Sequence, residues 1–494
     1  MDPSQANEQT PLISPQAQQL VYDQTISDHP RSDPPPATSV PWSQVIPICL
    51  IHIAEASSFT CIFPFITEFL TAIDTPKDKI GLYGGIAEGC VQIIEAILAI
   101  FWAKMADRFG RKKCLILGFI LPICSTTFLG FGKSVGWIIF WRAISGLNPA
   151  QTINRVILAE ISNPSNRARI YPITDPAYTV GVILGTTIGG ELSSPYHKLP
   201  RWLGGEVLLF RDYPYALPCL TTTVVGVIAL LTSMILLKES KPLEVEARPG
   251  EQQQQSTVAD TLKAPYYKTV LLVFCVYQFA NMALFGGLYT VWGYTPVLDG
   301  GLGLPVEIIG RLSVIANLSF VFGAPFFVPI IQKRLGAKRG LLLTTGIIPV
   351  EVLGIPVVQW AATKGRKAIY ETLWLEYGMT TLHAFSWPIC HQFLVACFDD
   401  YPQLRATGMA VTLIAGAVGR ATGPALAGWI YSYSTQFPTG SFGRQLSWLV
   451  IFWLVLPAVV LTSYIPRDLE KKAEGGHGSD EEEQVAGLLH SHDE

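Results

Sequence analysis

Charged residues are scarce in this sequence. Aspartate, glutamate, lysine and arginine make up 15% of its 494 residues, whereas about a quarter is usual in soluble globular proteins. Apolar residues make up 49%. Because the formal net charge is only -3 at pH 7, we expect no basic surface and no nucleic-acid partner. These proportions indicate a chain whose solvent is lipid.

Enzyme, pump and metal-binding motifs are also lacking. The sequence contains neither an HExxH motif nor a GxxxxGK[ST] loop, which argues against a zinc protease and against an ATP-driven pump. Its nine cysteines form no CxxC pair, so neither a zinc site nor a disulfide framework is expected. We therefore expect no enzyme activity, no metal and no cofactor.

The first forty residues have few apolar side chains and are rich in proline, glutamine and serine. They lack the basic segment, apolar core and cleavage site of a signal peptide, so the first apolar segment is expected to act as the membrane signal. Within them, Glu8-Gln9-Thr10-Pro11-Leu12-Ile13 resembles an acidic dileucine sorting signal. The resemblance implies delivery to a vacuole or lysosome, and the alternative is a disordered spacer.

Long apolar runs, by contrast, are abundant. A membrane-spanning helix needs about 20 apolar residues, and prolines such as Pro64 and Pro388 do not argue against a span, because neighbouring helices can satisfy the freed backbone groups. We therefore expect an all-α polytopic membrane protein with twelve transmembrane helices. The segments are approximately 44–70, 82–104, 114–132, 136–160, 171–191, 214–237, 267–295, 307–331, 340–362, 372–397, 405–432 and 447–465.

Polar segments divide these spans into two groups of six. The stretch from Lys238 to Lys268 is polar and glutamine-rich, as is typical of a flexible linker. The predicted units are a disordered cytoplasmic tail (1–41), a six-helix bundle (42–237), a cytoplasmic linker (238–266), a second six-helix bundle (267–466) and a disordered acidic tail (467–494).

The distribution of lysine and arginine predicts the orientation. Of the 35 basic residues, 21 lie in the tails and in the connections from even to odd spans, ten lie in the opposite loops and four lie within spans. The positive-inside rule therefore places both termini in the cytoplasm.

An internal repeat relates the two groups of spans. Residues 163–190 recur in part 238 positions later, and the loop around Gly110 recurs 226 positions later around Gly336. Parallel six-helix repeats with a substrate path between them are typical of secondary transporters. The matches at the first offset include Arg167 with Arg405, Gly181 with Gly419, Gly185 with Gly423 and Gly190 with Gly428.

The stretch from Ala103 to Lys113, "AKMADRFGRKK", resembles the loop signature of the major facilitator superfamily, with Ala103 in place of the usual first glycine. The resemblance implies a cytoplasmic gate made of charged side chains, in which the glycine permits a tight turn. The alternative is an ordinary positive-inside loop. The matching residues are Asp107, Arg108, Gly110, Arg111 and Lys112.

Two further motifs resemble those of this superfamily. Arg142 and Gly146 match an Arg-x-x-x-Gly motif whose arginine is associated with proton coupling. The glycines of 171–191 resemble the signature of proton antiporters, although Thr186 replaces its proline; close helix packing is the alternative explanation. The glycine motifs comprise Gly181, Gly185, Gly189 and Gly190, and Gly419, Gly423, Pro424 and Gly428. The chain is most similar to the drug:proton antiporter and zinc-induced-facilitator-like groups.

Ionisable residues inside spans are functional candidates, because each costs about 2.5–3.5 kcal/mol at a helix centre. Counting 1.5 Å per residue places His52, Glu55 and Glu95 near one level at the midplane, and we predict a pair between Glu88 and Arg142. The alternative is structural hydrogen bonding between helices. The full set is His52, Glu55, Glu88, Glu95, Arg142, Asp175, Glu351, Glu376, His383, His391 and Arg420.

In the second group of spans, Glu351, His383 and Arg420 fall near the middle and are placed with the substrate and proton cavity. Glu376 and His391 fall towards span ends, where a structural role or snorkelling is favoured. Outside this set, Arg155 and Glu160 are interpreted as gate or interface charges.

Together these features predict a monomeric carrier that works by alternating access and is driven by a proton gradient. Proton antiport, either efflux or organelle loading, is favoured, with a drug-like cation, secondary metabolite, organic acid or metal chelate as substrate. Uptake by proton symport or facilitated diffusion is an alternative, favoured by Thr186, and a transporter-like receptor is another. The expected location is the plasma membrane or a vacuolar or lysosomal membrane.

Overall fold

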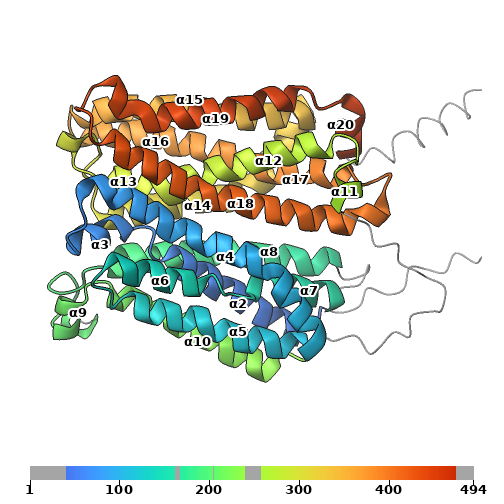
Figure 1. Cartoon of the computed structure of the whole chain (residues 1–494), viewed down its shortest axis with the longest axis horizontal. Coiled ribbons are helices and arrows are strands. Elements are labelled where there is room, and N and C mark those ends of the chain that lie inside the picture. Colours follow the sequence, from blue (N-terminus) through green and yellow to red (C-terminus); the bar gives the residue numbers. More distant parts are fainter. Residues whose placement is uncertain (1–39, 162–166, 204, 240–257, 474–494) are drawn as a thin grey trace, which may run out of the picture.

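The structure of the protein, a computed structural model, describes residues 40–161, 167–203, 205–239 and 258–473, and helices joined by turns and short loops make up this part (Figure 1). This part contains no β-strand. The side chain of the candidate Asp175 lies outside the described part of the chain. So do most of both predicted tails and most of the predicted linker.

The helices before the linker pack as one group (Figure 1). They are α2 (Trp42–Thr60), α3 (Ile66–Ala72), η1 (Lys77–Lys79), α4 (Ile80–Phe109), α5 (Arg111–Leu129), α6 (Val135–Ser145), α7 (Ala150–Ile161), α8 (Arg167–Leu192), η2 (Arg201–Leu203), α9 (Leu208–Asp212) and α10 (Ala216–Leu236).

The helices from α11 onwards form the second group (Figure 1). They are α11 (Val258–Thr261), α12 (Tyr267–Met282), the π-helical turn η3 (Ala283–Leu288), α13 (Tyr289–Tyr294), η4 (Val297–Asp299), α14 (Val306–Leu335), α15 (Ala337–Ala362), α16 (Arg366–Ala384), α17 (Ser386–Ala396), α18 (Pro402–Ser434), η5 (Phe442–Gln445), α19 (Leu446–Ser463) and α20 (Arg467–Ala473). Thus α11 lies inside the predicted linker, and α20 occupies the start of the predicted acidic tail, with Leu469 buried.

Eight helices in the described residues are long and apolar enough to cross a membrane. They coincide with eight of the twelve expected spans, and the count of twelve stays a prediction. The other four expected spans are 44–70, 136–160, 171–191 and 372–397.

Three of those four spans are interrupted four residues before a proline. A proline has no N–H to donate to the carbonyl four residues earlier, and its ring clashes with that carbonyl. The fourth span lies within the continuous helix α8. The helix ends and prolines are Thr60 and Pro64, Ser145 and Pro149, and Ala384 and Pro388.

The two groups meet along α4 and α18 and along α8 and α14 (Figure 1). We call the end at which α4 gives way to α5 the basic end, because Arg108, Arg111 and Lys112 lie there. The other end, which carries α3 and α9, is called the α3 end. Buried apolar clusters fill each group, so the charged candidates lie against packed helices.

Candidate functional site

Three ionisable side chains of the first group form a central cluster: His52 and Glu55 of α2 and Glu95 of α4. Glu55 is 6% exposed, and its Oε1 accepts a hydrogen bond from Asn148 Nδ2 at 2.7 Å. Glu55 and Glu95 interact electrostatically, which agrees with the common depth that residue counting predicts for them. We call His52, Glu55 and Glu95 the central cluster.

Each member of the central cluster has a buried polar atom with no hydrogen-bond partner in the described part of the chain. These atoms are His52 Nδ1, Glu55 Oε2 and Glu95 Oε1. Buried polar groups are nearly always paired in proteins. Three unpaired atoms in one place therefore indicate a site built to receive a proton or a polar group of a ligand.

Two cations act on the central cluster. Arg155 of α7 interacts electrostatically with His52, Glu55 and Glu95, and Arg420 of α18 interacts with Glu95. The central cluster and these two cations thus bring together two carboxyl groups, one imidazole and two guanidinium groups, with Arg420 supplied by the second helix group.

Sequence reasoning missed Arg155 and Asn148 as members of this site. The position of Arg155 in the sequence predicts a gate or interface charge, yet its electrostatic partners lie in the central cluster. Glu160 does lie at the basic end, where it accepts a hydrogen bond from Arg111 at 2.9 Å. Both Asn148 and Arg155 are polar residues inside one expected apolar span, which is the signal that could have found them.

Arg420, predicted near the middle of its span together with Glu351 and His383, is separated from those two by the structure. Its Nε donates to Gln92 Oε1 of α4 at 3.0 Å, so it faces the first group across the interface. His391 also lies within the electrostatic reach of Arg155 and Arg420. A helical side chain covers only one face, and neither depth nor span number reveals which.

Glu88 and Arg142 form the predicted pair. Arg142 Nη2 lies 2.9 Å from Glu88 Oε2, and each side chain is 1% exposed. Arg142 also donates to the carbonyl oxygens of Ala87 and Phe59 at 3.2 Å, and its guanidinium lies over the Phe59 ring. The arginine therefore joins α6 to α4 and α2.

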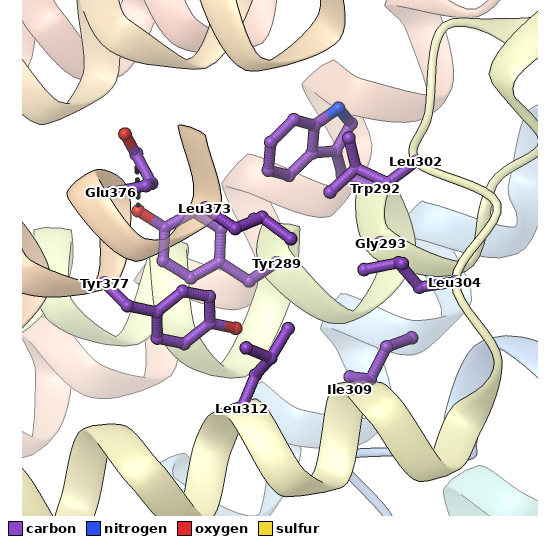
Figure 2. A pocket seen from close by; sticks show the side chains of 10 residues that line it. All are labelled: Tyr289, Trp292, Gly293, Leu302, Leu304, Ile309, Leu312, Leu373, Glu376 and Tyr377. Atoms are coloured by element: carbon purple, nitrogen blue, oxygen red, sulfur yellow. Dashed lines mark hydrogen bonds between the residues drawn. The ribbon is translucent and has the colours of Figure 1, made fainter. Parts of the chain in front are cut away.

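A second buried cluster lies wholly in the second group. Glu351 Oε1 accepts from Tyr289 Oη at 2.5 Å and from Thr380 Oγ1 at 2.7 Å, and Glu351 Oε2 lies 2.5 Å from His383 Nδ1. Tyr289 Oη also lies 3.0 Å from Glu376 Oε1 (Figure 2).

The expectation for Glu376 is wrong in one respect. Its side chain does not snorkel at a span end but is 2% exposed inside this cluster. Because α16 begins at Arg366, six residues before the expected span, Glu376 lies about 15 Å along that helix.

The loop motif at the basic end is held by specific contacts. Gly110 has φ of +100°, a conformation that glycine adopts at little cost. The N–H of Arg111 donates to Glu239 Oε1 at 2.6 Å, and Arg111 Nη2 lies 2.9 Å from Asp107 Oδ1. Arg108 lies over the ring of the adjacent Phe109.

The copy of this loop has the same arrangement. Gly336 has φ of +83°, and the N–H of Lys338 donates to Glu470 Oε1 at 2.9 Å. In each group, therefore, a carboxylate from the end of that group binds the positive end of a helix dipole.

The glycine motifs pack against equivalent helices. A Cβ atom added to Gly181, Gly185 or Gly189 of α8 would collide with carbonyl oxygens of α2 or of the turn that follows it. In α18, a Cβ at Gly419 would lie 2.6 Å from Cys275 O, and one at Gly423 would lie 2.5 Å from Phe279 O, both in α12.

The remaining small residues join the two groups. Gly190 of α8 faces Gly310 of α14, Gly428 of α18 faces Gly81 of α4, and Pro424 of α18 faces Gly85 of α4. These contacts bring the groups together near the α3 end.

Ion pairs close that same end. Among the described residues, each ion pair that joins the two groups lies at the α3 end, and the basic end has none. The pairs are Lys77 with Asp299 at 3.4 Å, Lys198 with Glu307 at 2.5 Å and Arg311 with Glu191 at 2.6 Å.

Residues 48–381 match the family model described as Major Facilitator Superfamily. This match covers more than half of the chain. The chain belongs to the Major Facilitator Superfamily. It is accordingly an integral membrane transporter of small molecules and not an enzyme.

Curated relatives of this superfamily member include transporters of fungi and plants. The protein called efflux pump azaK of Aspergillus niger is 25% identical over 475 residues, which cover 93% of this chain and 97% of that protein. The Arabidopsis thaliana protein named ZINC INDUCED FACILITATOR 1 is 23% identical over 456 residues, which cover 85% of this chain and 91% of the relative.

Solved structures of this superfamily share the fold. A bacterial homologue of the human lysosomal transporter Spinster, inward-facing and occupied, matches with a TM-score of 0.62 at 16% identity over 85% of this chain and 95% of that one. A D-xylose-proton symporter matches with a TM-score of 0.64 at 14% identity over 88% of this chain and 99% of that one.

One enzyme-like motif remains in this transporter. Residues 132–136 read Gly-Lys-Ser-Val-Gly, the GxSxG pattern of serine hydrolases. Ser134 is the N-cap of α6, and its hydroxyl accepts from the N–H of Trp137 at 3.3 Å. A helix cap explains this serine.

Proposed function

We propose that this chain is a proton-coupled antiporter that moves a small organic molecule out of the cytoplasm, by efflux or organelle loading. The observation that carries the proposal is the central cluster, in which two carboxyl groups and one imidazole each have an unpartnered polar atom and two cations act on them. The name of the Aspergillus niger relative, an efflux pump, supports this direction.

The cluster suits exchange because protons and substrate compete for the same carboxyl groups. When Glu55 or Glu95 is ionised, it attracts a cationic or hydrogen-bonding substrate; when it is protonated, that attraction is lost. Arg155 and Arg420 bring positive charge from two different helices. Relative movement of the two groups would therefore change the charge that each carboxyl group meets.

Alternating access would connect the cluster to each side in turn. The glycine contacts and the three ion pairs between the groups support an arrangement closed at the α3 end. In the proposed orientation, with both termini cytoplasmic and the basic end inside, this is the inward-facing stage. The protein would work as a monomer, in the plasma membrane or in a vacuolar or lysosomal membrane.

Proton-linked flux in sealed vesicles tests this proposal. Glu55→Gln and Glu95→Gln should each lower pH-driven flux of a transported compound at least about tenfold, corresponding to about 1.4 kcal/mol. The matched control Glu206→Gln, an exposed glutamate paired with Arg201, should keep wild-type flux. Unchanged pH-driven flux in both cluster variants would overturn the coupling assignment.

Proton symport is the second candidate, and Thr186 favours it. Where the antiporter signature has proline, Thr186 is buried and donates to the carbonyl of Val182 at 2.8 Å, so α8 has no proline to kink it at this position. The same vesicles distinguish the modes. Antiport requires that an imposed pH gradient drive substrate against the proton flow, and symport requires movement with it.

A further inference from the structure

The buried cluster of the second group contains more acidic than basic groups. Glu351 is 0% exposed and Glu376 is 2% exposed, and they meet the same tyrosine hydroxyl, that of Tyr289. Among the described residues, the one nearby group that can be cationic is His383. Two ionised carboxylates would leave this site with a net negative charge in the interior, which is costly.

Counting hydrogens shows how many protons the observed contacts need. Tyr289 has one hydroxyl proton but lies within hydrogen-bond distance of both Glu351 and Glu376, so one carboxyl group must carry a proton for both bonds to form. His383 Nε2 faces Asn281 Oδ1 at 3.3 Å, a contact that uses the single N–H of a neutral imidazole, so the 2.5 Å contact between Glu351 Oε2 and His383 Nδ1 needs a second proton. With two labile protons the site is neutral and each of these contacts is a hydrogen bond.

The surrounding helices supply no other charge to this site in the described residues. His383 Nε2 faces Asn281 Oδ1 of α12 at 3.3 Å. The titratable neighbours are Tyr277 of α12 and Tyr377 of α16. Tyr277 interacts electrostatically with Glu351, and Tyr377 interacts with both carboxyl groups. A cavity of about 10 Å³, lined by Tyr289, Glu376 and Tyr377 among others, adjoins the site (Figure 2). That volume suits about one water molecule, so the cavity can hold a water that passes on a proton but cannot hold an organic substrate.

The position of Tyr289 links this site to the closed α3 end. Tyr289 follows directly after the π-helical turn η3, a feature frequent at functional sites. A Cβ at Gly287 in η3 would lie 3.2 Å from Pro424 Cα of α18, and Phe285 makes an edge-on contact with Phe63 of the first group.

The two acidic residues and Tyr289 lie on helices with different neighbours. Glu351 and Glu376 lie on α15 and α16, which pack on each other, whereas α13, which begins with Tyr289, packs on α3 and α4 of the first group as well as on α14 of its own group. Opening of the α3 end would therefore move Tyr289 relative to the two carboxyl groups and remove the hydroxyl that bridges them.

We infer that Glu351, Tyr289, Glu376 and His383 form a second proton-binding site, which holds two labile protons while the α3 end is closed and releases one when it opens. The release step deepens the proposed function, since it adds a proton site distinct from the central cluster. Binding of the protons stands on the geometry alone.

Infrared difference spectroscopy on the full chain in lipid vesicles tests the protons directly. At neutral pH, Glu376→Gln and Glu351→Gln should each remove the absorption of one protonated carboxyl group from the wild-type spectrum. Tyr289→Phe should shift that band without removing it, because the acid loses its hydrogen-bond partner. The control Glu371→Gln, an exposed glutamate on α16, should leave it unchanged.

A conformational lock tests the link to the α3 end. Lys77 and Asp299 pair across the groups at 3.4 Å, so Lys77→Cys and Asp299→Cys can be joined by a short thiol cross-linker, with each single variant as control. The joined protein should keep the band to a pH higher by at least about one unit, tenfold in proton affinity.

The outcomes separate the two proposals. Loss of the band in neither glutamine variant overturns the second site, and equal midpoints in joined and unjoined protein overturn its link to the α3 end. A wild-type protein that carries the band but shows no pH-driven flux contradicts the proposed function and leaves the site standing. Since glutamine has nearly the shape of a protonated glutamate, both variants should fold, and a thermal melt checks this.

Discussion

Arg142 of the first group is a buried charge that needs compensation by its neighbours. It is among the largest fully buried side chains, and its charge is compensated by Glu88, by two carbonyl oxygens and by the face of an aromatic ring. A buried charge that loses its partner is strongly destabilising, whereas replacing both partners by neutral groups of similar size is often tolerated.

This asymmetry predicts the effect of Arg142→Met on stability. The variant should lower the free energy of unfolding in detergent by about 3–5 kcal/mol, because Glu88 is left buried without a cation. The double variant Glu88→Gln, Arg142→Met should recover most of that loss. Removing an exposed partner by Arg201→Met should change stability by less than about 1 kcal/mol. An equal loss in the single and double variants would contradict the charge argument.

Glycine contacts matter at the scale of the elements. Gly81, Gly85 and Gly89 of α4 lie at successive turns, and each meets a backbone carbonyl of α18 where a Cβ atom would be. Backbone cannot move aside as a flexible side chain can. The closed arrangement of the α3 end therefore depends on the absence of side chains along this face of α4.

Gly85→Ala should accordingly shift the protein away from the closed arrangement. Its methyl group would collide with the carbonyl of Pro424, so α4 and α18 must separate. Ser432 is 4% exposed and its hydroxyl accepts from the N–H of Leu82. Labelling of Ser432→Cys by a hydrophilic maleimide should therefore rise about tenfold, which corresponds to a shift of about 1.4 kcal/mol in the equilibrium between closed and open arrangements. Gly378→Ala on α16, with no atom within 4 Å of its Cβ, should leave labelling unchanged.

Counting along apolar segments predicted the depth of ionisable residues well in the first group, although two of its expected spans are interrupted. It placed Glu55 with Glu95, which interact electrostatically, and it paired Glu88 with Arg142, whose helices α4 and α6 pack on each other. It failed for Glu376, because the true start of α16 lies outside the apolar segment.

Two kinds of information were not in the sequence pattern. Tyr289 is apolar enough to count as part of a span, so a search for ionisable residues passed over it, although its hydroxyl bridges two carboxyl groups. The face of α18 that carries Arg420 is decided by packing against α4. Periodicity assigns a residue to a face but does not say which neighbour that face meets.

At the scale of the whole molecule, the charged contacts between the two groups are unevenly distributed. Ion pairs join the groups at the α3 end, while the charged network at the basic end, around Arg111, stays within one group. The central cluster lies between these ends, with Arg420 and Gln92 in contact across the interface. Opening and closing would therefore exchange contacts at the two ends while the central contact persists.

The sidedness of this asymmetry decides which stage of transport the closed α3 end represents. The excess of basic residues at the basic end predicts that the α3 end faces away from the cytoplasm. Glycosylation mapping in microsomes checks this, since acceptors are modified only on the lumenal side. Val207→Asn with Leu209→Thr creates an acceptor in an exposed segment at the α3 end and should be glycosylated. His477→Asn creates Asn-Gly-Ser in the C-terminal tail and should not be. The reverse pattern would place the closed end at the cytoplasm, and the direction of proton-coupled exchange would then have to be inverted.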